Sequence, residues 1–192
     1  IAYTGPLVIL TSRITASASE IVAGAMKDYA RAVIVGDDHT FGKGTVQSFV
    51  HQPGRLGAIK VTTALFFRPG GASTQHDGVA ADVVLPSLFA TDDLGERYTP
   101  YSLKTQVIPP FLGALGRVST VPHGDWKPID ANVLAELQRR SSARITGDAE
   151  FIEINEKLAK RAQEDDVIHL AEFIKEREEE EAEAEAKNGT KD

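Results

Sequence analysis

Two short apolar runs, one on each side of a helical segment, constrain the fold of this chain most. The runs are residues 7–10 and 32–35, and both are short and rich enough in Val and Ile to form buried strands. Between them, apolar side chains recur at helical spacing over 21–29, which predicts a helix with one apolar face. Ser17 precedes this helix and Glu20 follows three residues later, the spacing of a capping box. The sequence therefore predicts a strand, a helix and a second strand, with the helix packed on a sheet.

A serine at the start of this helix and a lysine after the second run could act as a nucleophile and its base. Ser17 would lie beside the unpaired N–H groups and the positive dipole end of the helix, where the N–H of Ala18 could stabilise an oxyanion. A serine hydroxyl needs a base, and a lysine can be that base when burial lowers its pKa. Lys43 has glycine on both sides and no adjacent carboxylate, which favours a partly desolvated amine. If the chain is extended from Lys43 onward, Gln47 points the same way and could hold the amine by a hydrogen bond.

Each of these residues has a simpler interpretation when it is taken alone. Ser17 could be only an N-cap, and Lys43 only a solvated surface lysine. The glycines around the lysine resemble a phosphate-binding loop, but five residues instead of four separate Gly36 from Gly42. Gly44 also stands where Ser or Thr would bind magnesium, so we reject that loop. The case for catalysis rests on the serine and lysine segments occurring together.

Together, the two segments resemble the carboxyl-terminal processing (tail-specific) proteases, which are serine proteases with a Ser–Lys dyad. The shared motifs are Ser-Ala-Ser-Glu-Ile at 17–21 and Phe-Gly-Lys-Gly-Thr-Val-Gln at 41–47, followed by the runs at 70–75 and 78–83. The resemblance covers about residues 6–86, and the later residues resemble more loosely the C-terminal extension of the Prc/Tsp branch. It implies an α/β fold with a mixed sheet and packed helices, of the layered kind shared with crotonases and ClpP.

The resemblance implies a role for each matching position. Ser17 matches the nucleophile, Lys43 the general base and Gln47 the residue that orients the lysine. Ala18 matches the position whose backbone N–H contributes to the oxyanion hole. Asp28 matches an acidic position of the Prc/Tsp branch, which we interpret as supportive and not catalytic.

The sequence also departs from the family pattern. Ser12 and Thr15 replace residue types that are common in the family, and the turn at 37–39 is one residue longer, a change that a turn tolerates without affecting the dyad. In the family, a PDZ domain and a glycine-rich strand motif precede the serine, and the latter supplies the other oxyanion donor. Neither precedes Ser17 here. We therefore expect this chain to be the C-terminal part of a longer protease, with weak or no activity alone.

By resemblance, the expected function is that of a serine endopeptidase that cleaves polypeptides with apolar, poorly structured C-termini. The expected substrates are cell-envelope proteins, and the expected compartment is the bacterial periplasm. No metal or organic cofactor is expected. The composition agrees with this class: the net charge of −7 argues against nucleic acid, no apolar run approaches a membrane span, and the absence of cysteine excludes disulfides and thiolate metal sites.

Strand signals continue after the lysine. Residues 58–67 are rich in β-branched and aromatic side chains and are the best strand candidate in the chain. A Pro-Gly-Gly turn at 69–71 is expected to return this strand toward a short apolar run at 83–85. We therefore expect a mixed α/β layer with the serine helix packed on it.

Composition divides the chain into four parts. Residues 1–88 would be the C-terminal part of the catalytic core, and 89–127, rich in Pro, Gly, Asp and Thr, an irregular connection. Residues 128–174 carry apolar side chains at helical spacing and predict a small helical module. Residues 175–192 are rich in Glu, Ala and Lys and predict a charged, disordered tail.

Three alternative functions stay open at this point. A Ser–His–Asp site could use His39, His51 or His76, although no spacing singles out one of them, and none has helical spacing for a metal. The same fold could be a catalytically silent scaffold that binds partners. It could also be a hydrolase of small acyl substrates.

Overall fold

The computed structural model describes residues 3–91, 94–111 and 127–162, together with 170–171, 173–175 and 177. It divides into two compact units, Ile1–Leu158 and Ala159–Asp192. The first unit contains every strand found in the described residues, and the candidate site. In the second unit, the described residues are mainly helical.

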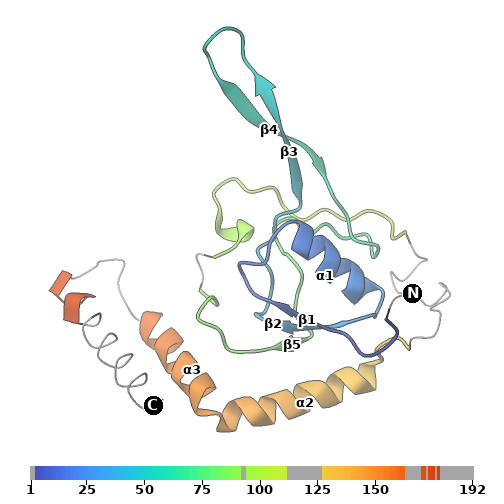
Figure 1. The fold of residues 1–192 in the computed structure, drawn as a ribbon, viewed down its shortest axis with the longest axis vertical. Coiled ribbons are helices and arrows are strands. Elements are labelled where there is room, and N and C mark those ends of the chain that lie inside the picture. The colour runs from blue at the N-terminus through green and yellow to red at the C-terminus, as the bar shows by residue number, and fades with distance from the viewer. Residues whose placement is uncertain are drawn as a thin grey trace. The chain divides into compact units, whose positions relative to one another are not determined.

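The first unit is built on a three-stranded parallel sheet in the order β1-β2-β5 (Figure 1). The strands are β1 (Val8–Thr11), β2 (Val33–Gly36) and β5 (Val83–Val84). The helix α1 (Ala18–Asp28) connects β1 to β2, as a parallel pair requires. The predicted strand–helix–strand unit is confirmed, and with it the α/β fold class.

The core lies between α1 and the sheet, but α1 buries a different face from the predicted one. The core residues are Ala23, Ile34 and Val79, and the buried residues of α1 are Glu20, Ala23 and Gly24. Ile21 and Val22, which the apolar pattern placed in the core, are 46% and 54% exposed. Ala23 and Gly24 face the core because small side chains let the helix backbone approach its neighbours closely.

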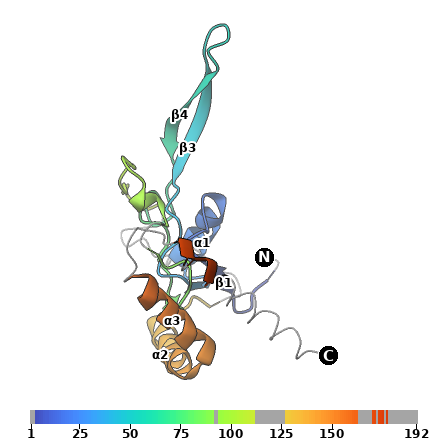
Figure 2. The same cartoon turned by 90° about the vertical axis from the view of Figure 1, so that its left-hand side faces the viewer.

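After the lysine, the chain forms an antiparallel hairpin of β3 (Thr45–His51) and β4 (Ala58–Leu65). Figures 1 and 2 both show this hairpin extending away from α1 and the parallel sheet. The predicted return of the second strand toward 83–85 is wrong. β4 pairs with β3 across a short turn that contains Gly54 and Gly57 at positive φ, while β5 joins β2 in parallel.

Helical elements follow the sheet. They are a 3-10 turn (η1, Glu96–Tyr98), α2 (Ala131–Gly147) and α3 (Ala149–Arg161). Asp130 caps α2 by accepting from the Val133 N–H, and α2 lies beside β5, where the Gln138 amide donates to the Asp82 carbonyl at 2.8 Å. The two helices fall where the helical module was predicted, while its last helix and the acidic tail lie largely outside the described residues. The four-part domain division stays a prediction. Within the described ranges, no helix combines the length and apolar character needed to span a membrane.

Candidate active site

Ser17 has an unusual backbone conformation at the start of α1. Its φ is 59° and its ψ is −116°, a region that non-glycine residues rarely adopt and that costs on the order of 1–3 kcal/mol. Such strain persists only where the surroundings hold the residue. Here the Ser17 N–H donates to the Glu20 carboxylate at 2.8 Å, which is one half of the predicted capping box. The serine is therefore held in a sharp turn between a loop and a helix.

Glu20 is the centre of the site, although its side chain is fully buried. Its Oε2 accepts from the N–H groups of Ser17 and Lys43, both at 2.8 Å. Its Oε1 accepts from the Gly42 N–H at 2.7 Å and from the Thr40 hydroxyl at 2.5 Å. Because one oxygen atom binds both backbone nitrogens, the carboxylate joins the residue predicted as nucleophile to the residue predicted as base.

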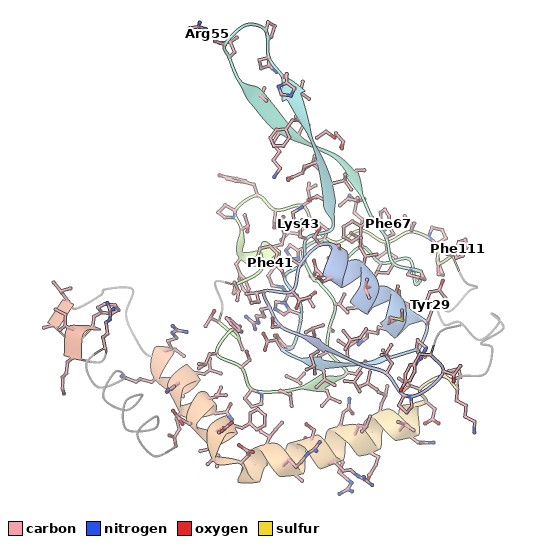
Figure 3. All side chains as sticks on the ribbon, in the orientation of Figure 1. Tyr29, Phe41, Lys43, Arg55, Phe67 and Phe111 are labelled. Atoms are coloured by element: carbon pink, nitrogen blue, oxygen red, sulfur yellow. The ribbon has the colours of Figure 1, made fainter. Side chains whose placement is uncertain are left out.

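The backbone on either side of Lys43 is held on all sides. The Phe41 N–H donates to the Thr15 carbonyl at 2.9 Å, and the Phe41 carbonyl accepts from the backbone N–H of Glu96 at 2.7 Å. The Gly42 carbonyl accepts from the backbone N–H of His76 at 2.8 Å, and the Gly44 carbonyl accepts from the backbone N–H of Phe66 at 3.0 Å. Figure 3 shows Lys43 beside the N-terminal end of α1, at the base of the β3–β4 hairpin. The backbone of the lysine loop is therefore fixed beside the start of the serine helix.

The Lys43 side chain is half-buried, and its amine donates to the Thr45 carbonyl at 3.3 Å. None of the described hydrogen bonds joins Gln47 to Lys43. β3 begins only at Thr45, and the lysine lies in the irregular loop before it, so the orientation of the amine by Gln47 stays a prediction. Gln47 lies opposite Thr62 in the hairpin.

The Ala18 N–H is the first of α1, where no carbonyl of the helix itself can accept it. None of the hydrogen bonds described for residues 3–91 uses this donor. The contribution of this N–H to an oxyanion hole stays a prediction.

Asp28, at the end of α1, lies away from these groups and holds a turn. Its Oδ2 accepts from the Gly70 N–H at 2.8 Å, and its Oδ1 lies 3.6 Å from the Arg68 guanidinium. A Cβ on Gly70 would lie 2.9 Å from the carboxylate, so the turn approaches Asp28 too closely for a side chain there. These contacts suit the supportive role that the sequence suggested.

Two acidic residues hold the loop that precedes the serine. The Arg13 N–H donates to the buried Asp37 at 2.6 Å, and its guanidinium makes two hydrogen bonds to Asp38, at 2.9 and 3.1 Å. Partial burial raises the pKa of Asp38, but the hydrogen bonds from Arg13 and the nearby His39 outweigh it and hold that pKa below its usual range. The longer turn at 37–39 is thus part of the support of the site.

No described contact joins a histidine to Ser17. The buried His39 directs its Nδ1 to the Thr40 carbonyl at 2.7 Å, and His51 lies exposed at the end of β3. His76 uses both ring nitrogens, with Asp77 Oδ1 at 2.8 Å and the Lys104 amine at 2.9 Å. Over the described ranges there is also no group of three or more His, Asp or Glu side chains that could hold a metal ion.

Sequence reasoning missed the buried polar side chains around the lysine loop. Glu20 was seen only as a capping residue, and nothing singled out Thr40 or Gln75, both of which are fully buried. Single-sequence patterns do not separate a buried polar residue from a surface one. The available signals were the position of Glu20 within the serine motif and that of Gln75 at the end of the shared run 70–75.

Comparisons with known proteins show what this chain is similar to. Residues 1–85 match peptidase family S41. The chain is 38% identical to a tail-specific protease of Haemophilus influenzae over 83% of its own length and 23% of that protein, and 42% identical to a carboxy-terminal-processing protease of Bartonella bacilliformis over 51% and 21%. A solved photosystem II D1 C-terminal processing protease is 37% identical over 47% of this chain and 26% of that chain, with a TM-score of 0.37.

This chain spans about a quarter of the length of these relatives. The matched residues contain both the Ser17 turn and the Lys43 loop. Residues 1–85 therefore carry the match to peptidase family S41, and the chain is similar to the tail-specific and carboxy-terminal-processing proteases.

Proposed function

We propose that this chain carries the Ser–Lys dyad of a serine endopeptidase of the tail-specific class. The observation that supports this most is the shared Glu20 oxygen, which places the backbones of Ser17 and Lys43 side by side. The strained conformation of Ser17 supports it as well, because such strain gathers at functional sites.

In the proposed reaction, the Lys43 amine takes the proton of the Ser17 hydroxyl while Oγ attacks the scissile carbonyl carbon. The Ala18 N–H donates to the oxyanion that forms, and a second donor would come from the glycine-rich motif of the family. When the C–N bond breaks, Lys43 returns the proton to the leaving amine, and water then hydrolyses the acyl-enzyme. The bond from Lys43 to the Thr45 carbonyl is long, so exchanging it for one to Ser17 costs little.

We further propose that Gln47 orients the lysine once a substrate is bound, and that these residues act as part of a longer protease and have weak or no activity alone. The proposed substrates are polypeptides with apolar, poorly structured C-termini, in particular cell-envelope proteins of the bacterial periplasm. These proposals rest on the family resemblance and on the length of the relatives.

Digestion of an unfolded polypeptide with an apolar C-terminus by the intact protein tests the dyad. Ser17→Ala should abolish cleavage, and Lys43→Ala should lower kcat by roughly 10²- to 10⁴-fold. Lys60→Ala and Ser48→Ala, which change exposed residues of the hairpin, are matched controls that should leave kcat within about twofold.

The alternatives predict different results. A Lys43→Ala variant with parental activity would place the base elsewhere, with a histidine as the next candidate. Cleavage of small esters without any digestion of polypeptides would favour the small-acyl hydrolase. An intact protein that is inert toward both substrates would favour the silent scaffold.

A further inference from the structure

We infer that Gln75 is a positioning residue for Lys43, an inference that rests on the proposed Ser–Lys chemistry. Gln75 is fully buried, and its Oε1 accepts from the Gly44 N–H at 3.0 Å. Its Nε2 donates to Glu96 Oε1 at 3.0 Å and to the Leu103 carbonyl at 3.3 Å. The residue next to the proposed base is therefore tied to an amide that is itself held from two other segments.

The hydrogen-bond partners of this amide leave it one orientation. The Glu96 carboxylate and the Leu103 carbonyl are acceptors, so the nitrogen of the Gln75 amide must face them. The Gly44 N–H is a donor, so the amide oxygen must face it. A flipped amide would lose all three bonds, which means that Gln75 presents its oxygen to the lysine loop permanently.

The lysine loop is also in close steric contact with Gln75. A Cβ added to Gly44 would lie 2.5 Å from the Gln75 backbone nitrogen and 2.8 Å from Ser73 Oγ. Real Cβ contacts are longer than this, so a side chain at position 44 would push the two segments apart. Gly44 is the residue that lets the loop lie against Gln75.

Together, Glu20 and Gln75 bind three consecutive N–H groups around the lysine. Glu20 accepts from those of Gly42 and Lys43, and Gln75 from that of Gly44. Glu20 fixes the loop relative to the serine helix, and Gln75 fixes its other end. Without Gln75, the Gly44 N–H would lose its acceptor, and the segment after Lys43 would be held at Gly44 only through the carbonyl that binds the Phe66 N–H. An error of about 1 Å in a catalytic group can cost about 10²-fold in rate.

Glu96 completes this arrangement. Its backbone N–H donates to the Phe41 carbonyl at 2.7 Å, and its carboxylate accepts from the Gln75 amide. The segment around Glu96 therefore holds the lysine loop directly at Phe41 and indirectly at Gly44. This link suggests a variant pair that reverses the polarity of the Gln75–Glu96 bond.

The test uses the intact protein, digesting the same unfolded polypeptide at a temperature well below the Tm of each variant. Gln75→Met keeps the volume but removes the strong acceptor, and it should lower kcat roughly 10- to 100-fold with KM within about twofold. The double variant Gln75→Glu/Glu96→Gln restores an acceptor for Gly44 and a donor for the introduced carboxylate. It loses the bond to the Leu103 carbonyl, the longest of the three, and should recover part of the lost kcat.

Gln138→Met is the matched control. It removes the hydrogen bond that the side-chain amide of Gln138, on α2, donates to the Asp82 carbonyl, away from the lysine loop. It should leave kcat within about twofold. If Gln75→Met does not fold, Glu96→Ala takes its place, since it removes the carboxylate that orients the amide, and it should lower kcat roughly 3- to 10-fold.

Parental kcat in Gln75→Met, or in Glu96→Ala, would overturn the inference, as would an equal loss in Gln138→Met. A double variant that regains stability but not kcat would also overturn it. Ser17→Ala and Lys43→Ala, measured alongside, separate the two proposals. If these two variants stay active, the proposed dyad is wrong. If they are inactive and Gln75→Met is not impaired, the dyad stands and only the proposed role of Gln75 is wrong.

Discussion

Glu20 occupies a place that water does not reach, and four protein donors replace the water that its carboxylate would otherwise bind. Three of them are backbone N–H groups and one is a hydroxyl. Burying a polar group without a hydrogen-bond partner costs several kcal/mol of folding free energy. The Glu20 carboxylate and its four donors avoid this cost by binding one another. The same side chain thus contributes to stability and joins Ser17 to Lys43.

Glu20→Gln should therefore affect both stability and activity. An amide has one oxygen, so two of the four donors would face an NH₂ group that cannot accept. We expect a loss of about 2–4 kcal/mol in the free energy of unfolding, measured by urea denaturation, and a fall in kcat. Glu136→Gln is the control, because the described partners of this carboxylate are Arg139 and Arg140 on the exposed face of α2. An unchanged urea midpoint in Glu20→Gln would contradict the expectation.

At the scale of the element, α1 is positioned by its small residues. Gly24 lies against the Arg68 side chain, and a Cβ there would come within 2.4 Å of Arg68 Cδ and 3.4 Å of Val79. Arg68 cannot move away freely, because its guanidinium lies near Asp28, at the end of the same helix. The helix, the turn at 68–71 and the core are therefore packed as one unit.

This packing reverses the usual effect of replacing a helical glycine. Gly24→Ala would gain about 1 kcal/mol from helix propensity, but overpacking against Arg68 costs about 1–3 kcal/mol. We expect a net loss of stability in urea denaturation. Gly147→Ala, at the end of α2 with no atom within 4 Å of the added Cβ, should be neutral or stabilising. A Gly24→Ala variant more stable than the parent would show that Arg68 moves without cost.

At the scale of the whole molecule, the sequence predicted elements better than their partners. The periodicity of β1, α1 and β2 was enough to predict the strand–helix–strand unit, with Ser17 before the helix and Lys43 after the second strand. It could not show that β4 pairs with β3 and β5 with β2, because alternation identifies a strand but not its neighbour. It also could not show that Glu20 and Gln75 are buried, since that depends on donors from distant segments.

Acidic residues with lowered pKa values link the stability of the molecule to pH. Partial burial raises the pKa values of Asp38 and Asp77, but Arg13 acting on Asp38, and Thr105 and His76 acting on Asp77, outweigh it and lower both. A carboxyl group whose pKa is lower in the folded state than in the unfolded chain binds fewer protons when folded. Its contribution to stability is complete above the unfolded pKa, about 4, and is lost as the pH falls through the folded value.

We therefore expect the free energy of unfolding to fall as the pH drops from about 4 toward 2. Above pH 4 the opposite trend competes, because protonation reduces the net charge of −7 and its self-repulsion. Asp38→Asn removes one of the two carboxyl groups, so its stability should decline less steeply in the acid range, while its stability at pH 7 should be lower than that of the parent. Urea denaturation of both proteins at pH 7, 5, 4 and 3 measures the two curves. Parallel curves would mean that the Arg13–Asp38 pair contributes nothing to the acid sensitivity. That outcome would fit the half-exposed position of Asp38, because exposed ion pairs often contribute little to stability.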